Sequence, residues 1–287
     1  MKIIAFGEVL WDVIDGNYHL GGAPLNFASH SFKNGISSGI LSAYGNDELG
    51  RKSLEAIKKL NVDTDLLQVV KNNPTGVVNV EVTNGQPSYF IKSEVAYDYI
   101  NFNQIDINKI SEYKALYFGT LAQRSIVSRD CLRQILSQFN FEFIFCDINL
   151  RQNFYSHEVL DFSFNNCTIL KLNDEEADIV SDLIFGKKLS LELLSEALSE
   201  KYSNISVIII TKGAEGCLVF EKCKFVSVPS QPIVVKDTIG AGDSFSAAFC
   251  SVYFKSKDVK LAATFANKVA GFVASKSGAI PDYELGQ

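Results

Sequence analysis

The residues that most clearly indicate chemistry lie in the stretch Asp237–Phe249, DTIGAGDSFSAAF. Gly240, Ala241 and Gly242 precede a helix-like run, and backbone N–H groups at a helix start favour an anion such as phosphate. A carboxylate, Asp243, follows at once and would oppose a plain anion site. Such a carboxylate is useful where an attacking hydroxyl must lose its proton beside a phosphoryl group. For an isolated GAGD, the commoner interpretation is a capped helix after a flexible turn.

Two other glycine patterns indicate weaker alternatives. The stretch Gly45–Ser53, GNDELGRKS, is near a Walker A loop, but Arg51 follows its second glycine and Lys52 comes one position late. Gly240 and Gly242 could open a dinucleotide-binding GxGxxG, but Phe245 occupies the third glycine position, where close helix–strand packing is needed. We therefore expect neither motif to be functional.

Composition narrows the class of protein. The chain has 287 residues, is 47% hydrophobic and carries a net charge of -6, which disfavours a nucleic-acid partner. No apolar run approaches the roughly 20 residues that span a bilayer, and the N-terminus turns acidic too early for a signal peptide. The six cysteines form no CxxC pair and the three histidines show no zinc-like spacing. We expect a cytoplasmic protein with reduced thiols and no structural metal, and magnesium stays compatible because it needs few protein ligands.

Strand-like and helix-like segments alternate along most of the chain. Apolar runs such as Lys2–Leu10 and Ile36–Gly45 predict buried strands, and residues 47–60 predict a helix capped by Asp47. Thr75–Ile91 is different, because its alternating β-branched residues around Asn84-Gly85 predict a hairpin. The alternation predicts a mostly parallel sheet covered on both faces, with ligands beyond the carboxyl ends of its strands.

Three shorter predictions concern element boundaries. His19–Asn26, HLGGAPLN, predicts a turn, and a helix is expected from Phe27 onwards. The stretch Gly216–Val228 predicts a second hairpin, and Ser244–Ser256 predicts a helix after the GAGD turn.

The whole of Asp237–Phe249 resembles the C-terminal signature of the ribokinase-like (PfkB) family of sugar kinases. Further segments resemble family motifs in the expected order, namely GGAPLNFA (Gly21–Ala28), GNDELG (Gly45–Gly50), DINLR (Asp147–Arg151), NDEE (Asn173–Glu176) and TKGAEG (Thr211–Gly216). The resemblance covers essentially the whole chain. It implies a single ribokinase-like domain over residues 1–287: a doubly wound α/β fold whose mostly parallel sheet is flanked by helices, with a small β-sheet lid formed from about 12–20 and 75–100.

The resemblance also implies a role for each motif. Asp243 would remove the proton of the acceptor hydroxyl, beside an anion turn made by Gly240, Ala241 and Gly242. The sugar-binding residues would be Asp12, Gly22, Asn26, Asn149 and Arg151. The nucleotide side would comprise Asn173, Thr211, Gly213, Gly216 and Asn267. Glu176 would organise Mg²⁺, ATP would be the phosphoryl donor, and K⁺ is expected near the D-T-x-G-A-G-D loop. A homodimer through the lid is also implied.

Several of these residues have a structural alternative. Asp12 could cap a turn, Asn26 could cap a helix, and Arg151 could form a surface ion pair. Glu176 at a helix start is already explained by the helix dipole. Trp11 departs from the commoner family opening, and it would either alter sugar packing or fill the core.

Within the family, GEVLWDVI followed by GGAPLNFA is most similar to the fructokinases. Ala23-Pro24 replaces the Gly-Lys-Gly turn of ribokinases and is the main indication of a hexose. The alternatives are ribose, a nucleoside or a 2-keto-3-deoxy sugar acid, and a sugar acid would need a cation at the acceptor site, for which Arg151 is the candidate. A catalytically silent sugar-binding regulator is a further alternative, although the intact GAGD argues against it.

Overall fold

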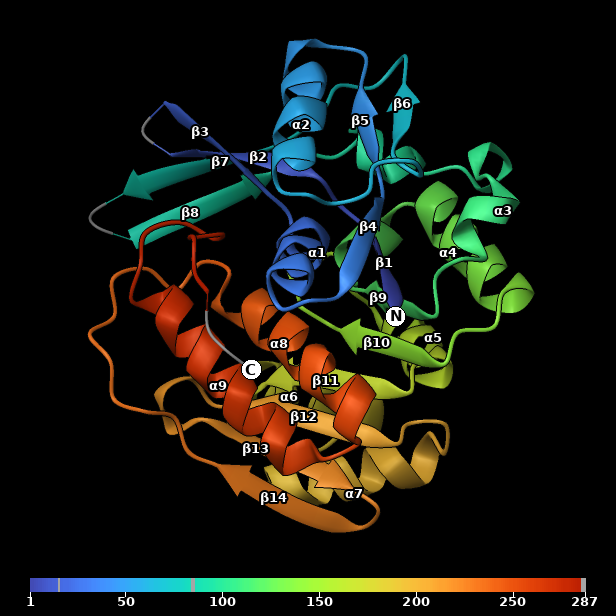
Figure 1. Ribbon diagram of the computed structural model, residues 1–287. Helices are drawn as coiled ribbons and strands as arrows, with labels where there is room; N and C mark the ends of the chain where they lie inside the picture. Colours follow the sequence, from blue (N-terminus) through green and yellow to red (C-terminus); the bar gives the residue numbers. More distant parts are fainter. Residues whose placement is uncertain (15, 84–85, 285–287) are drawn as a thin grey trace.

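The central sheet of the computed structural model has eight strands in the order β14-β13-β12-β11-β10-β9-β1-β4 (Figure 1). The structure describes residues 1–14, 16–83 and 86–284, with side chains described outside residues 80–89. The parallel strands are β1 (Lys2–Phe6), β4 (Ser37–Leu41), β9 (Ala115–Phe118), β10 (Phe143–Asp147), β11 (Ile169–Asn173) and β12 (Val207–Thr211). The antiparallel hairpin β13 (Cys217–Glu221) and β14 (Lys224–Val228) completes one edge, as predicted.

Helices cover both faces of this sheet (Figure 1). On one face lie α1 (Ala23–Lys33), α8 (Ala241–Ser256) and α9 (Val259–Ala274). On the other lie α4 (Ile126–Gln138), α5 (His157–Asn166), α6 (Asp174–Phe185) and α7 (Leu191–Lys201). Alternate residues of β1 enter the two cores, Ile3 on one side and Ile4 on the other, because successive side chains of a strand point to opposite faces. The predicted mostly parallel, doubly covered sheet is confirmed.

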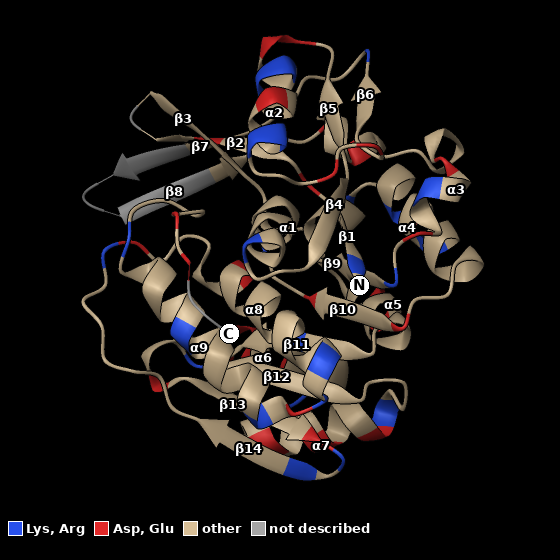
Figure 2. Cartoon of the chain, in the orientation of Figure 1, with Lys and Arg blue, Asp and Glu red and all other residues tan. Residues whose placement is uncertain are grey.

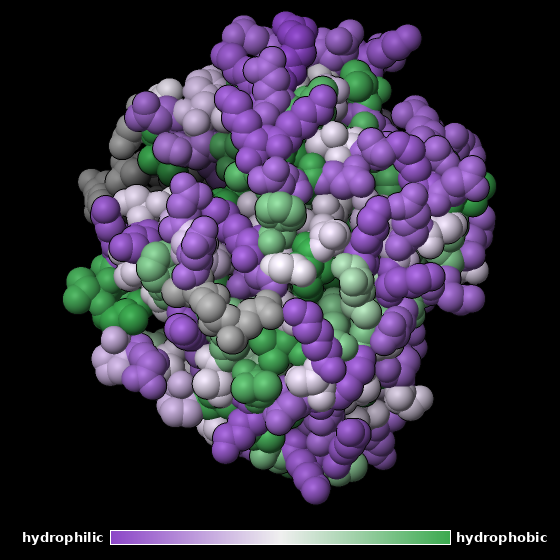
Figure 3. All heavy atoms as spheres, viewed as in Figure 1, coloured by the Kyte–Doolittle hydropathy of each residue, from purple (hydrophilic) through white to green (hydrophobic). Residues whose placement is uncertain are grey.

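The shorter elements lie around this body. They are α2 (Glu48–Lys59), α3 (Ile107–Ile110), the paired strands β5 (Ala43–Gly45) and β6 (Gln68–Val70), and the 3-10 helices η1 (Ala96–Tyr99), η2 (Phe102–Gln104), η3 (Leu121–Arg124) and η4 (Gly213–Glu215). Helix α2 carries both basic and acidic residues (Figure 2). The face of the molecule shown in Figure 3 is mostly hydrophilic. No helix within the described residues is long and apolar enough to cross a membrane.

A second, four-stranded sheet has the order β3-β2-β7-β8 and projects from one side of the main body (Figure 1). Its strands are β2 (Leu10–Ile14), β3 (Asn17–Gly21), β7 (Gly76–Thr83) and β8 (Gln86–Ile91). The predicted hairpin is confirmed by the antiparallel pairing of β7 with β8, whereas its Asn84-Gly85 turn lies outside the described residues. The division into body and lid, and any closing motion of this sheet, stay predictions.

Two helices begin earlier than the sequence predicted. Helix α1 begins at Ala23, inside the expected turn, because Pro24 in the first turn has a preset φ and gives up no helical hydrogen bond. Helix α8 begins at Ala241, directly after Gly240, whose left-handed φ of 77° suits glycine. The expected strand Ile36–Gly45 is also divided, because the chain leaves the central sheet after Leu41 and β5 pairs with β6 instead.

Two side chains attach α2 to the second sheet. Asp47 accepts the Gly50 N–H at 2.7 Å, which confirms the predicted cap, and its other oxygen accepts the N–H of Thr75 at 2.8 Å. Trp11 Nε1 donates to Ser53 Oγ at 2.9 Å, and its ring is buried. Alternation along β2 therefore turns Trp11 toward α2 and its neighbour Asp12 toward the cavity described below. Of the two alternatives for Trp11, packing is the one the structure supports.

Candidate active site

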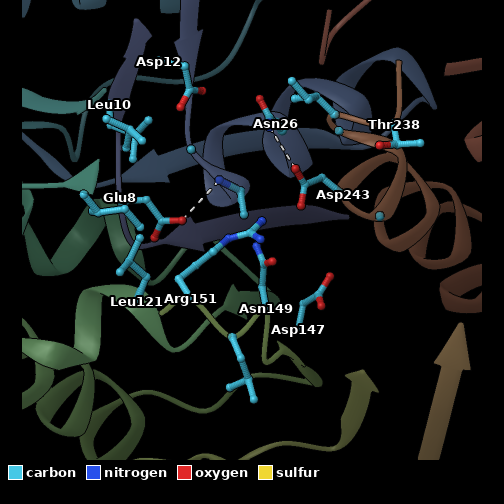
Figure 4. A pocket seen from close by; sticks show the side chains of 18 of the residues that line it. Glu8, Leu10, Asp12, Asn26, Leu121, Asp147, Asn149, Arg151, Thr238 and Asp243 are labelled. Carbon is cyan, nitrogen blue, oxygen red and sulfur yellow. Dashed lines mark hydrogen bonds between the residues drawn. The ribbon is translucent and has the colours of Figure 1, made fainter. Parts of the chain in front are cut away.

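A cavity of about 620 Å³ lies between the second sheet and the carboxyl ends of the central strands. Most of the predicted site residues line it, namely Asp12, Gly22, Asn26, Asn149, Arg151, Asn173, Glu176, Thr211, Gly240, Gly242 and Asp243. Figure 4 shows several of them converging on one space from different elements. Four predicted residues, Ala241, Gly213, Gly216 and Asn267, are not part of the lining.

The N-terminus of α8 opens into this cavity. Gly240 is the N-cap and no side chain caps the helix, so the N–H groups of Gly242 and Asp243 are not taken by a capping side chain. The amide of Ala241 is already used, because it donates to Thr238 O at 3.2 Å. The amides that remain for the predicted anion turn are therefore those of Gly242 and Asp243, and helix N-termini of this kind favour negative charge.

Asp243 lies in the first turn of α8 and is 9% exposed. Its Oδ2 accepts a hydrogen bond from Asn26 Nδ2 at 2.8 Å. Burial raises the pKa of Asp243 to about 6, while Asn26 and the nearby cations Lys171 and Arg151 oppose the rise. A carboxylate with such a pKa is ionised at neutral pH yet basic enough to accept a proton, which suits a general base.

A buried ion pair beneath the anion turn was missed in the sequence. Lys171 Nζ donates to both oxygens of Asp147, at 2.9 and 2.8 Å, and Ser246 Oγ of α8 also donates to Asp147. A Cβ added to Gly242 would lie 3.6 Å from Lys171 Nζ, so the ammonium group is close to the helix start. Burial by itself would lower the pKa of Lys171, but the charge of Asp147 and its hydrogen bonds have the larger effect and raise this pKa. The sequence contained an indication of this ion pair, because Lys171 interrupts the apolar run of β11 and pairs in register with Asp147 at the end of β10.

Asp12 lies on β2 and reaches the cavity from the second sheet (Figure 4). Burial raises its pKa to about 6, and the positive charge of Arg151 opposes this rise. A partly buried carboxylate at this position can accept hydrogen bonds from ligand hydroxyls. The alternative of a turn cap does not fit, because Asp12 lies within the strand and pairs in register with His19 and Val78.

Glu8 is a second residue that sequence reasoning missed. It follows β1, is 5% exposed, and its Oε1 accepts the N–H of Ala23 at 3.2 Å (Figure 4). Burial raises its pKa to about 7, and Arg151 opposes the rise. Gly22 is required beside it, since a Cβ there would lie 2.4 Å from Glu8 O and the residue has a φ of 109°.

Asn149 and Arg151 follow β10 and enter the cavity from below in Figure 4. Asn149 has a positive φ of 42°, which its short polar side chain tolerates better than most residues. Figure 4 shows the head group of Arg151 pointing into the space between Glu8 and Asp243. The charge of Arg151 favours the ionised form of Asp12, Glu8 and Asp243, so it acts on the site and not only at the surface.

Asn173 and Glu176 form a capping box at the start of α6. Asn173 Oδ1 accepts the N–H of Glu176 at 2.7 Å, and Glu176 Oε2 accepts the N–H of Asn173 at 2.9 Å. Glu176 Oε1 also accepts the N–H of Leu150 at 2.7 Å, and burial raises its pKa. Each carboxylate oxygen has a second lone pair, so this structural role leaves acceptor capacity toward the cavity.

Of the other residues predicted on the nucleotide side, only Thr211 lines the cavity. Thr211 lines it at the end of β12, whereas Gly213 and Gly216 shape the turn to β13 with φ of 52° and 93°. Asn267 Nδ2 donates to Val228 O at 3.0 Å, so this side chain ties α9 to β14. Within the described residues, no cluster of three His, Cys, Asp or Glu side chains is arranged to hold a metal ion.

Known proteins share both the sequence and the fold of this chain. A protein of Pyrococcus horikoshii is 30% identical over 297 residues, covering 96% of this chain and 91% of the relative. Its solved structure, described as an uncharacterized sugar kinase in complex with ATP, superposes with a TM-score of 0.84 at 28% identity and covers 97% of this chain and 94% of that one.

Two more distant relatives have named activities. A nucleoside kinase of Methanothermobacter thermautotrophicus is 27% identical over 273 residues, covering 93% of this chain and 82% of the relative. A fructokinase of Rhizobium leguminosarum bv. trifolii is 26% identical over 271 residues, covering 85% of this chain and 77% of the relative. The family model of the pfkB carbohydrate kinases matches residues 2–285, and the chain therefore belongs to that family.

Proposed function

We propose that this sugar kinase transfers the γ-phosphoryl group of ATP to a hydroxyl of a hexose, with fructose as the first candidate. The observation that carries the proposal is the hydrogen bond between Asn26 and Asp243. It joins the helix that follows the Gly-Gly turn, expected to bind sugar, to the helix start expected to bind phosphate. A hydroxyl bound between these two helices would meet a base and an anion site together.

Asp243 would accept the proton of the attacking hydroxyl as the phosphoryl group arrives. The N–H groups of Gly242 and Asp243, with Lys171 nearby, would stabilise the negative charge that develops on the transferred oxygens. Asn26 holds the carboxylate at a fixed orientation. The second sheet would close over the acceptor and exclude water, which otherwise competes as the acceptor.

The cavity also fits a magnesium ion held largely by water and phosphate oxygens. Glu176 and Asn173 supply hard oxygen atoms at the cavity wall, and Glu176 retains free lone pairs. A magnesium ion bound there would neutralise charge on the phosphates of ATP. ATP as donor is supported by the Pyrococcus horikoshii structure, which contains it.

Fructose is favoured by Ala23-Pro24 at the start of α1 and by the named fructokinase relative. A nucleoside is the second candidate, because the nucleoside kinase relative is equally similar. A coupled assay of ADP release with ATP, Mg²⁺ and a panel of fructose, ribose and nucleosides tests the proposal. Fructose should give the highest kcat/KM, and turnover of a nucleoside alone would refute the hexose assignment.

Asp12→Ala gives a second test of the same arrangement. It should raise the KM for sugar at least ~10-fold with little change in the KM for ATP, because a lost hydrogen bond to a charged group costs about 1.5–3 kcal/mol. An equal rise in the KM values for sugar and for ATP would contradict the placement of the sugar beside β2.

We further propose a homodimer that forms through the second sheet. Tyr18 on β3 and Phe90 on β8 are 54% and 62% exposed, which supports an apolar contact there. Light scattering on the double variant Tyr18→Ser and Phe90→Ser should give a monomer, and an unchanged mass would refute this interface. A potassium ion beside residues 237–243 and a cytoplasmic location stay predictions from the sequence.

A further inference from the structure

The segment that follows α9, residues 275–283, is called here the C-terminal strap, and it packs on the start of α8. Gly278 of the strap donates its N–H to Asp237 Oδ2 at 3.0 Å. A Cβ added to Gly240 would lie only 2.4 Å from Ala279 O, so the strap directly contacts the N-cap of α8. The strap therefore supports the loop and the helix start that form the predicted anion turn.

His30 of α1 holds this strap through both of its ring nitrogens. The residue is fully buried, with Nε2 at 2.9 Å from Ala279 O and Nδ1 at 2.7 Å from Tyr283 Oη. A carbonyl oxygen can only accept a hydrogen bond, so Nε2 carries the proton. Nδ1 then accepts the hydrogen bond that the tyrosine hydroxyl donates. Neutral His30 therefore satisfies one acceptor and one donor of the strap.

Further contacts join the strap to α1 and to the residue that ends it. The Tyr283 ring stacks on the His30 ring with centroids 5.6 Å apart, and Tyr283 Oη accepts from Asn34 Nδ2 at 3.2 Å. Lys33 Nζ also pairs with Asp282 at 2.9 Å, but the aspartate is exposed and such surface pairs contribute little. The buried contacts of His30 and Tyr283 are therefore the ones that hold the strap.

Helix α1 thereby supports the catalytic groups at two points. Asn26 donates to Asp243 (Figure 4). His30 lies four residues later, on the same helical face, and bonds to the carbonyl that contacts Gly240. Movement of this N-cap would displace the amides that follow it, and a displacement of about 1 Å can cost up to ~10²-fold in rate.

We propose that His30 is a positioning residue for phosphoryl transfer. Through Ala279 it holds Gly240, and with it the anion-binding amides at the start of α8, in place beside Asp243. The kinetic consequence rests on the proposed kinase function, whereas the support of the helix start does not. A histidine that only filled the core would contribute to stability without affecting kcat of the folded protein.

The test replaces His30 with leucine, which is apolar and bonds to neither group of the strap. With the best sugar acceptor, kcat of the folded variant should fall at least ~10-fold, while the KM for sugar changes less than about threefold. Hydrogen exchange followed by mass spectrometry gives a second readout. The amides of Ala241 and Ser244, which are bonded at the start of α8, should exchange at least ~10-fold faster than in the wild type.

Three further variants separate positioning from general stability. His30→Gln keeps an N–H that can donate to Ala279 O and should restore most of kcat. Tyr283→Phe removes only the hydroxyl group and should change kcat and exchange in the same direction as His30→Leu, so it carries the test if His30→Leu does not fold. The matched control is Tyr202→Phe, because Tyr202 is buried outside the cavity lining and donates to Asp161 at 2.8 Å. It should leave kcat and the exchange at α8 unchanged.

The outcomes separate this inference from the proposed function. Undiminished kcat in His30→Leu, or exchange at the start of α8 no faster than in the wild type, would overturn the inference. A loss of kcat in His30→Gln as large as in His30→Leu would overturn it too, because the bond to the strap would then be without effect. If the wild type phosphorylates no sugar, the proposed function fails, and the exchange comparison still decides whether His30 holds the helix start.

Discussion

Replacing Asp243 with asparagine separates catalysis from stability in this protein. Asparagine has nearly the same shape and keeps an oxygen that can accept the hydrogen bond from Asn26. It cannot take up the proton of an attacking hydroxyl. We therefore expect Asp243→Asn to fold and to bind ATP, with kcat reduced at least ~10²-fold, the lower end of general-base contributions.

The same change should stabilise the fold. Burial raises the pKa of Asp243 from 3.8 to about 6, so the folded protein holds this proton more tightly than the unfolded chain does. The free energy of unfolding therefore falls as the pH rises through this window. At one pKa unit per 1.36 kcal/mol, the ionised carboxylate costs about 3 kcal/mol above pH 6. The asparagine variant avoids this cost. Its free energy of unfolding should therefore equal that of the wild type near pH 4 and exceed it by about 3 kcal/mol at pH 7.5.

Coupled ADP release measures the loss of kcat, and urea unfolding at pH 4 to 7.5 measures the gain in stability. The matched control is Asp182→Asn, the same chemical change at an exposed position of α6, which should alter neither quantity. Near-normal turnover in Asp243→Asn would refute the general-base assignment. A variant no more stable than the wild type at pH 7.5 would refute the reasoning about the buried charge.

Three further predictions follow from the site and its supports. In the wild type, kcat/KM should fall about tenfold per pH unit below pH 6 as Asp243 gains its proton. A flat pH–rate profile from pH 5 to 7 would contradict the assignment of Asp243 as the general base. Lys171→Met should lower the free energy of unfolding by about 3–5 kcal/mol, because Asp147 is left buried without its cation. Urea titration measures this loss, and Asp147→Asn in the same chain should restore much of it. Trp11→Phe removes the hydrogen bond to Ser53 and should cost about 1 kcal/mol, and a double-mutant cycle with Ser53→Ala should show that the two losses do not add.

The fold and the reaction chemistry depend largely on features that are local in the chain. Alternating strand and helix patterns require a doubly covered parallel sheet, because each apolar face must be buried. The glycines at the start of α8 and the adjacent Asp243 also act through their own backbone and their neighbours in sequence. These features could therefore be predicted from the order of residues alone, together with the hairpin of β7 and β8.

The partners of the site residues were decided by the tertiary structure. Asn26 and Asp243 are 217 positions apart, and only the packing of α1 against α8 brings them within hydrogen-bonding distance. Glu8 lies within the run Lys2–Leu10 that was predicted as one strand, whereas in the structure it follows the end of β1 at Phe6 and lines the cavity. Conversely, Asn267 was predicted in the site from the family resemblance of the last helix, yet its side chain donates to the end of β14 and lies outside the cavity lining. Sequence patterns specify which way a side chain points along its own element, whereas contacts between elements depend on how the whole chain packs.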